Sequence, residues 1–255
     1  MKKYITFFFY ALFASAMTFT LAACGDDDDN DKSSSIPDTR TEAGKAAQMV
    51  DLGLPSGTLW ADRNVGADKP EAYGDYFAWG ETVPKSDYSW STYKYGTEHY
   101  DKYGAQYYEL TKYCSESSYG KDGYTDKFIE LELQDDAASV NWGGNWRMPS
   151  VEQIEELLDN TDNTWVSNFE GTGVSGMKFT NKKDSSKFIF LPATGYFYND
   201  ELDDAGSYGI YWSRTLLADA PSDACSLNFY SDDHVYGNDG DYRYYGCTVR
   251  PVVAP

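Results

Sequence analysis

The sequence predicts an α+β domain in which one well-defined helix precedes a series of short antiparallel strands. A helix is predicted over 151–158, because its apolar residues share one face while its three Glu residues fall on the other. A capping box of Ser150 and Gln153 marks its start. After the helix, β-prone runs alternate with Gly, Asn and Asp, which favours an α+β class: 174–180, 188–191, 208–212, 227–230 and 248–252.

The first half of the domain contains fewer clear elements. Residues 50–54 and 58–61 flank a Pro-Ser-Gly turn and predict a hairpin. A second, aromatic strand is predicted over 74–80, and Asp135-Asp136 is expected to open a short helix. Residues 82–123 form a long polar excursion rich in Tyr, with one short helix expected near 106–113; such connections are usually functional or poorly ordered.

The amino terminus predicts an export signal over residues 1–23. Lys2 and Lys3 precede an uncharged apolar stretch that two alanines close, which is the layout of a signal peptide. A membrane-spanning helix is the alternative for a stretch of this length. Leu21-Ala22-Ala23-Cys24-Gly25 favours the signal peptide, because it resembles the lipobox of bacterial lipoproteins. The resemblance implies that Cys24 is acylated, with chains such as palmitate, and becomes the mature terminus; a secreted protein with a chance cysteine is the other alternative.

Residues 24–47 are predicted to form a flexible tether. Four consecutive Asp follow Gly25, and a run of like charge without apolar residues cannot fold. The same run resembles the surface-export signal of Bacteroides-type lipoproteins. Since two acyl chains anchor stably where one does not, the membrane is a predicted partner through the lipid on Cys24. The expected location is the outer membrane, with the domain facing the cell exterior.

The remaining domain, residues 48–255, is acidic and rich in tyrosine. The net charge of the chain is -20 and becomes -22 when Lys2 and Lys3 are removed, so we expect no nucleic-acid partner. The chain has 23 Tyr and 7 Trp, and these side chains prefer one apolar and one wet side. This composition is typical of a binding surface.

Several separate motifs occur along the domain: VDLGLPSGTLWA at 50–61, NVGA at 64–67, YGDYFAWGE at 73–81, WRMP at 146–149, LPATG at 191–195, YWS at 211–213 and VRPV at 249–252. Together they resemble the Fibrobacter-type major paralogous domain. The resemblance covers nearly everything from Val50 onward and implies a C-type-lectin-like fold, related at a distance to formylglycine-generating enzymes. It implies that the terminal strands pair and that a loop-rich face above the carboxyl-terminal sheet is the contact surface. The family has no established shared activity.

The aromatic and basic residues of these motifs are predicted to be structural. Trp60, Trp79, Trp146 and Trp212 lie in glycine-flanked, apolar contexts that favour core packing. Arg147 and Arg250 also lie in apolar strings, and a buried arginine needs paired acceptors, so we expect carboxylate or carbonyl partners.

Three cysteines follow Cys24. Cys225 and Cys247 lie on strand-like runs that flank a predicted hairpin, and export permits a disulfide, so they are the candidate pair. Cys114 would then be a buried thiol. Spacing alone does not fix the connectivity.

No catalytic residues are assigned, and we expect a protein that is not an enzyme. His99 and His234 are far apart and lack further ligands at zinc spacing. Acidic residues are so numerous that any carboxylate pair for glycoside hydrolysis is uninformative. No cofactor is predicted; calcium is a minority hypothesis from acidic clusters at 200–204 and 232–241, since oxygen-rich loops suit this ion. Asn238-Asp239-Gly240-Asp241 fits a hairpin turn first.

The segment 223–245 is the predicted binding surface. Its mixture of Tyr, Ser, Asn, Asp and Gly is typical of antibody paratopes. It also resembles the variable carboxyl-terminal segment of lectin-like proteins diversified by retroelements. The alternative is that hairpin loops are simply polar. The candidate ligand-binding residues are Tyr208, Tyr230, Asp232, Asp233, His234, Tyr236, Asn238, Asp239, Tyr242 and Tyr244.

These observations favour a cell-surface lipoprotein whose domain binds a glycan or protein ligand. Two alternatives remain open at this point. One is an accessory or catalytic component of polysaccharide processing, and the other is a structural subunit of an envelope or fimbrial assembly.

Overall fold

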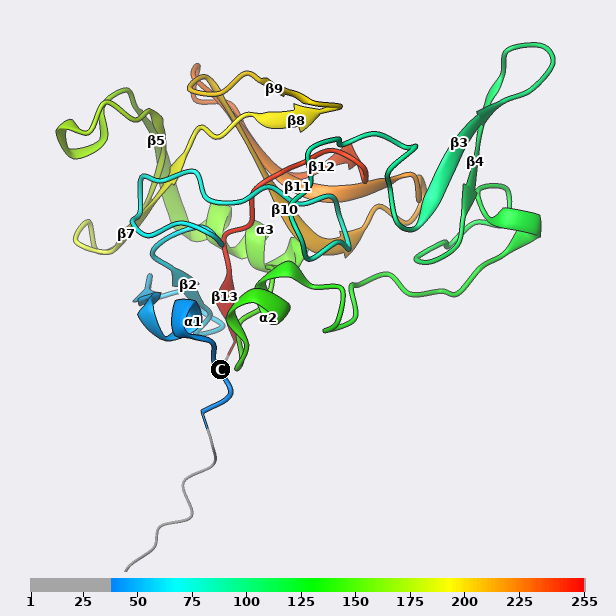
Figure 1. Cartoon of the computed structure of the whole chain (residues 1–255). Coiled ribbons are helices and arrows are strands. Elements are labelled where there is room, and N and C mark those ends of the chain that lie inside the picture. The colour runs from blue at the N-terminus through cyan, green and yellow to red at the C-terminus, as the bar shows by residue number, and fades with distance from the viewer. Residues whose placement is uncertain (1–37, 255) are drawn as a thin grey trace, which may run out of the picture. The chain divides into compact units, whose positions relative to one another are not determined.

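The computed structural model describes residues 38–254, in which small antiparallel sheets predominate over a few short helices (Figure 1). This agrees with a β-rich α+β domain. The helices are α1 (Glu42–Ala46), α2 (Ala137–Trp142) and α3 (Val151–Asn160), with single 3-10 turns η1 (Lys121–Gly123) and η2 (Phe169–Gly171). The strands are β1 (Met49–Asp51), β2 (Leu59–Ala61), β3 (Gly96–Tyr100), β4 (Gln106–Leu110), β5 (Thr161–Val166), β6 (Gly176–Asn181), β7 (Phe188–Pro192), β8 (Tyr196–Tyr198), β9 (Glu201–Asp203), β10 (Tyr208–Leu216), β11 (Asp223–Tyr230), β12 (Val235–Tyr242) and β13 (Val252–Val253).

The predicted signal peptide, Cys24 and the first part of the predicted tether lie outside the described residues. Within residues 38–254, no helix combines the length and the apolar character needed to cross a membrane.

The two ends of the domain meet in one sheet, with the order β1-β2-β13. Val50 lies opposite Trp60 in the β1–β2 pair, and Val252 lies opposite the same tryptophan from the other side. The predicted hairpin is confirmed, and the carboxyl-terminal strand pairs with the second strand of that hairpin. This closure fixes the domain ends side by side (Figure 1).

Residues 38–47 belong to the domain, so the predicted tether extends too far. The hydroxyl of Thr41 caps α1 and donates to the Asn141 carbonyl at 2.8 Å, while its backbone N–H donates to the Trp142 carbonyl at 2.9 Å. A Cβ on Gly44 would lie 2.1 Å from that same carbonyl oxygen, so only glycine permits this close packing of α1 on α2. These partners are distant in sequence, and local composition does not indicate them.

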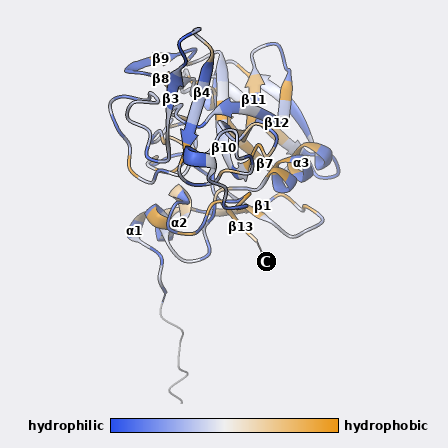
Figure 2. Ribbon diagram, turned by 90° about the vertical axis from the view of Figure 1, so that its right-hand side faces the viewer, coloured by the Kyte–Doolittle hydropathy of each residue, from blue (hydrophilic) through white to orange (hydrophobic). Residues whose placement is uncertain are grey.

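The helix α3 confirms the predicted capping box and amphipathic pattern. Gln153 N–H donates to Ser150 Oγ at 3.3 Å, and the Gln153 side chain accepts from Ser150 N–H at 2.9 Å. Ile154 and Leu157 are buried. Figure 2 shows both hydrophilic and hydrophobic colour on this helix, as expected for an element with one face on a core.

The β10-β11-β12 sheet separates two hydrophobic cores. Successive side chains of a strand point to opposite faces. On β10, Ile210 and Trp212 therefore join a first core with α2 and the aromatic residues of the excursion. Tyr211, together with Leu227 and Phe229 of β11, joins a second core with α3 and the β5-β6-β7 sheet.

The long excursion is an ordered arm, and two predictions made within or beside it are wrong. Residues 106–110 form β4 instead of a helix and pair with β3 in a hairpin that projects from the body (Figure 1). The pairing is favoured by cross-strand contacts such as His99 stacked on Tyr107 at 5.2 Å. Residues 74–80 form only an isolated bridge between Phe77 and Cys247, because glycines with positive φ at both ends turn the chain away from an extended path.

The four tryptophans and Arg250 that were predicted to be structural are buried, whereas Arg147 is half-buried. All four tryptophans predicted for the core have at most 1% of their surface exposed. Arg250 donates to Asn64 Oδ1 at 2.7 Å and to the Ala61 and Asp62 carbonyls at 3.2 and 3.0 Å. Arg147 donates to Ser139 Oγ at 2.9 Å and to its neighbouring carbonyl. The acceptors are neutral oxygens, so the carbonyl alternative of the prediction is correct.

A third buried arginine, Arg243, was not predicted. Its Nε donates to Tyr93 Oη at 2.8 Å. Its remaining bonds go to the main-chain carbonyls of Tyr113 (3.0 Å), Pro221 (2.9 Å) and Lys112 (3.0 Å). One guanidinium thus joins the arm, the loop before β11 and the segment after β12.

Replacement of Arg243 should therefore destabilise the whole domain. We expect Arg243→Leu to lower the free energy of unfolding by about 3 kcal/mol or more, because it leaves several buried acceptors unpaired. Chemical denaturation would measure this, with Arg40→Leu as the control, since the Arg40–Asp38 pair is partly exposed and such pairs contribute about 0–1 kcal/mol. Equal losses for both variants would contradict this role for Arg243.

Candidate functional site

The candidate site is built on one face of the β10-β11-β12 sheet. The pairing of β11 with β12 is irregular between Ser226 and Asn228, because two residues of β12 lie opposite Leu227 of β11. This bulge shifts the alternation of β12. As a result Tyr236 lies opposite Asn228, and Asp239 lies opposite Ser226, so both project to the same face. Regular pairing would have placed them on different faces.

Tyrosine rings form a continuous arc over this face. Tyr236 contacts Tyr230 edge-on at 6.3 Å, and Tyr230 stacks on Tyr208 at 4.3 Å. Tyr208 meets Tyr196 of β8 at 6.2 Å, and Tyr196 meets Tyr245 at 5.1 Å. The arc continues from Tyr245 to neighbouring rings, and we call the whole set the tyrosine face: Tyr196, Tyr198, Tyr208, Tyr230, Tyr236, Tyr242, Tyr244 and Tyr245.

A small polar group, which we call the carboxylate cluster, belongs to the same face: Ser226, Asn228, Asp239 and Asp241. Ser226 Oγ donates to Asp241 Oδ2 at 2.5 Å. Asn228 Nδ2 donates to the same oxygen at 3.0 Å and to Asp239 Oδ2 at 3.1 Å. The two carboxylates are thus held side by side through one amide group.

Burial raises the pKa of Asp241, and the nearby charge of Asp239 raises it further, while hydrogen bonds from Ser226 and Asn228 act in the opposite direction. Burial also raises the pKa values of Tyr196, Tyr208 and Tyr245, and the charge of Asp241 adds to each rise. The carboxylate of Asp241 is therefore close to three members of the arc. Other titratable groups acting on or influenced by Asp241 are Asp223 of β11 and Cys247.

Five of the ten predicted binding residues line one shallow depression: Tyr230, Asp232, His234, Tyr236 and Asp239. Tyr230 and Tyr236 are 39% and 48% exposed. Tyr242, at 36%, is also accessible. The structure thus brings half of the predicted set together around one depression.

The other predicted residues have different surroundings. Tyr208 and Tyr244 are only 8% and 7% exposed, so they support the outer rings from beneath and do not offer a free surface. Asp233 forms part of the turn between β11 and β12, where its Oδ1 accepts from Trp165 N–H at 2.8 Å. Asn238 is exposed at the bulge.

Sequence reasoning missed Tyr196, Tyr198, Tyr245 and the joint role of Asn228 with Asp241. The first two come from β8, which approaches the face through the Phe197–Gly246 bridge. Asp239 and Asp241 were interpreted as part of a turn, but residues 238–241 lie within β12, and the hairpin turn lies at 231–234. Their spacing of two residues was the available signal for a shared face.

The predicted disulfide is not formed. Cys114, Cys225 and Cys247 are free and buried. Cys225 alternates with Leu227 and Phe229 toward the second core, whereas Cys247 packs in the first core. The β10-β11-β12 sheet separates the two thiols, and a disulfide requires the Cβ atoms to face each other. The prediction that Cys114 is buried is confirmed.

The acidic loops do not gather into a metal-binding group in the part of the chain that the structure describes. The carboxylate cluster brings together two carboxylates and the amide group of Asn228. Calcium binding therefore stays a prediction, and no set of ligands for the ion is identified among the described residues.

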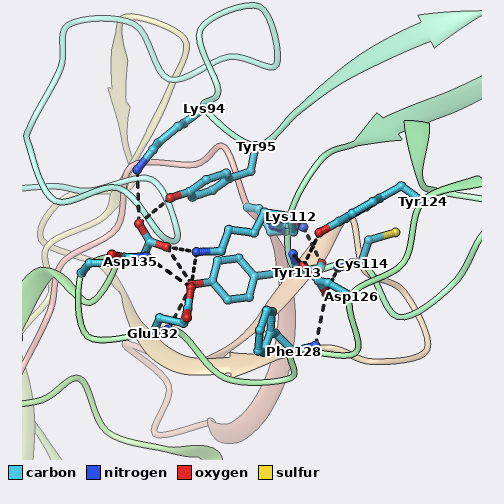
Figure 3. Close-up of polar contacts among 12 residues, drawn as sticks. Lys94, Tyr95, Lys112, Tyr113, Cys114, Tyr124, Asp126, Phe128, Glu132 and Asp135 are labelled. Atoms are coloured by element: carbon cyan, nitrogen blue, oxygen red, sulfur yellow. Dashed lines mark hydrogen bonds and ion pairs between the residues drawn. The ribbon is translucent and has the colours of Figure 1, made fainter. Parts of the chain in front are cut away.

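A second buried polar centre surrounds Asp135 (Figure 3). Lys112 Nζ lies 2.6 Å from Asp135 Oδ2, and Tyr113 Oη donates to that oxygen at 2.8 Å. Lys94 Nζ and Tyr95 Oη donate to Oδ1, the former at 3.2 Å. Although burial alone would raise it, these hydrogen bonds lower the pKa of Asp135 to about 2.

This centre is suited to holding the arm in place. Its carboxylate stays ionised and each of its oxygens is already occupied by donors from residues 94–113. Next to the carboxylate cluster, by contrast, lies an accessible depression, and neither Asp239 nor Asp241 forms an ion pair with the described residues. The arrangement on the tyrosine face can bind a ligand by ring contacts and hydrogen bonds, and we place the candidate site there.

Comparison with known proteins finds no matching family model, no matching curated protein and no matching solved structure.

The raised pKa of Asp241 predicts that this residue lowers stability at neutral pH. We expect Asp241→Asn to raise the melting temperature at pH 7, because the amide removes a poorly solvated charge. With a raised folded pKa, the wild type gains stability as the pH falls through that value, so the advantage of the variant should disappear below about pH 4.

Thermal melting at both pH values would measure this effect. Asp162→Asn is the matched control, since Asp162 is exposed on β5 and is not a member of the cluster. A variant at position 241 that melts below the wild type at pH 7 would show that the carboxylate stabilises the fold.

Proposed function

We propose that this protein is a lipid-anchored cell-surface protein whose domain binds a glycan or protein ligand through the tyrosine face. The observation that carries the proposal is the grouping of exposed Tyr230 and Tyr236 beside Asp239 around one depression of a rigid sheet, with exposed Tyr242 joined to the same arc of rings through Tyr245. Rigid aromatic rings offer contact area at low entropic cost, and adjacent polar groups supply directional bonds. Sites on sheets are held in place more firmly than sites on loops.

The fold and the anchor are parts of the same proposal. The motifs from Val50 onward resemble the Fibrobacter-type major paralogous domain, and a C-type-lectin-like fold would place its contact surface above the carboxyl-terminal sheet. The tyrosine face lies on that sheet. The resemblance of residues 21–25 to a lipobox supports acylation of Cys24, which would attach the domain to the outer membrane facing the cell exterior.

Binding should depend on the outer rings of the tyrosine face. We expect Tyr236→Ala and Tyr242→Ala each to weaken binding about tenfold, since exposed aromatic anchors contribute about 1–3 kcal/mol. The full chain would be tested on a glycan array and in pull-downs with envelope and host extracts.

Tyr124→Ala is the matched control, because Tyr124 is 38% exposed but hydrogen-bonds Asp126 beside the arm. Melting temperatures should stay unchanged in all three variants. Ligand binding that survives both substitutions on the tyrosine face would remove this surface from the proposal.

The state of the cysteines tests the anchor. Mass spectrometry of protein unfolded in iodoacetamide without reductant should find Cys24 acylated and the other three cysteines alkylated, because those three are free. Unmodified Cys24 in protein recovered from the envelope would contradict the anchor. An unalkylated pair would contradict the assignment of free thiols.

A further inference from the structure

The carboxylate cluster contains more hydrogen-bond acceptors than donors. Its donors are the Ser226 hydroxyl, the Asn228 amide and the Gly240 N–H, which donates to Asp239 Oδ1 at 3.0 Å, and all three are used within the cluster. Asp241 receives both of its bonds at Oδ2, which leaves Oδ1 without a donor among the described residues. A carboxylate has about four lone-pair sites and no proton to donate, so the group lacks donors.

Asn228 provides a second and independent observation. Its side chain is aimed at the two carboxylates, and the residue is only 1% exposed. Its Oδ1 is buried without any hydrogen-bond partner. An unpaired buried carbonyl oxygen costs free energy, and such groups in native structures call for an explanation. In the described part of the chain, this oxygen therefore adds to the surplus of acceptors in the cluster.

Among the described residues, no lysine or arginine pairs with the carboxylates of the cluster, and His234, which lines the same depression, lies 2.9 Å from Asp232. After Lys187 the sequence contains no lysine and only three arginines, against ten acidic residues. Arg243 and Arg250 are buried, and Arg214 pairs with Glu130 at 3.1 Å. In residues 38–254, neither Asp239 nor Asp241 takes part in an ion pair. The negative charge is therefore left for a partner.

The surrounding rings suit the same kind of partner. Tyr208 and Tyr230 stack nearly parallel, with 20° between their planes, and Tyr236 stands at 83° to Tyr230. Rings at right angles present both faces and edges to one depression. The negative face of an aromatic ring attracts ammonium and guanidinium groups within about 6 Å.

From these observations we propose that the tyrosine face recognises an organic cation, with Asp239 and Asp241 as its counter-charge and Tyr230 and Tyr236 as its aromatic wall. The chemistry is that of an ammonium or guanidinium group, which a lysine or arginine side chain carries and which an amino sugar also carries. Such a group donates hydrogen bonds and accepts none, so it complements a cluster with surplus acceptors. A neutral sugar brings hydroxyls that both donate and accept, and it leaves the two charges unpaired. This inference rests on the proposed function and specifies the chemical class of its ligand.

Matched cationic and neutral probes test the inference. Calorimetric titration of the full chain in detergent would compare a glucosamine tetramer with its fully N-acetylated counterpart, and a blocked Gly-Lys-Gly peptide with its lysine-acetylated form. We expect binding of at least one cationic probe and binding at least tenfold weaker for its neutral counterpart. The cationic probe that binds more tightly identifies the source, sugar or protein.

Variants then locate the effect. Asp241→Asn and Asp239→Asn should each weaken the cationic probe about tenfold, since each removes a charged acceptor. Asp162→Asn changes the net charge equally at an exposed site outside the cluster and should change affinity less than twofold, which separates local recognition from the general attraction of an acidic protein. A melting curve for each variant establishes that it folds, and Asp239, which is exposed, provides a variant with little risk to the core.

Three results would overturn the inference. They are equal binding of neutral and cationic probes, absence of binding by both cationic probes, and equal effects of the Asp162 and Asp241 substitutions. The proposed function fails separately. If the binding of a ligand from the array or pull-down depends on Tyr236 but not on Asp241, the assignment of the binding face stands and the proposed recognition of a cation is wrong.

Discussion

The buried guanidinium of Arg243 is the interaction on which the rest of the structure depends. It lies 5.0 Å from the ring of Trp79 and is surrounded by neutral oxygens, with no carboxylate among its hydrogen-bond partners. A charge in such a place is tolerated only when its donors are satisfied. Because those acceptors come from the arm and from the loop before β11, segments far apart in sequence must be in place together. The chain on either side of Arg243 is thereby fixed, and Tyr242 and Tyr244 receive their positions in the arc.

The charged groups of the tyrosine face differ from Arg243, because they are not fully matched by partners from the chain. Around Asp135 and Arg243, buried charge is matched by donors or acceptors from the chain and serves to join segments. At Asp241 and Asn228 the described residues do not provide a partner for every buried polar atom. Burial raises the pKa of the Asp241 carboxyl, and Oδ1 of Asn228 has no hydrogen-bond partner among these residues. Perturbed groups of this kind concentrate at functional sites, where stability is given up for binding. The contrast between the two regions is the reason for assigning the site to one and the scaffold to the other.

Local signals predicted much of the fold, whereas the site depends on features with no local signature. The capping box of Ser150 and Gln153 and the hairpin around 55–57 are short-range patterns, and both are present. The helix expected near 106–113 failed because cross-strand contacts with β3 decide that segment. The binding segment 223–245 was found by composition, but composition cannot distinguish Tyr236, which is exposed, from Tyr244, which is buried. Only the bulge opposite Leu227 places Asp239 and Tyr236 on one face, and the disulfide prediction failed because the sheet between Cys225 and Cys247 is a product of tertiary structure.

The central claim is that Asp241 is a partly buried carboxylate that binds a cationic group. The most direct test is an NMR titration of its carboxyl carbon in the free protein and in the presence of the cationic probe that binds. The account predicts a pKa above the ordinary aspartate value in the free protein and a marked fall when the probe is bound, because a cation favours the ionised form. An ordinary pKa in the free protein, or a pKa that does not change on binding, would contradict it.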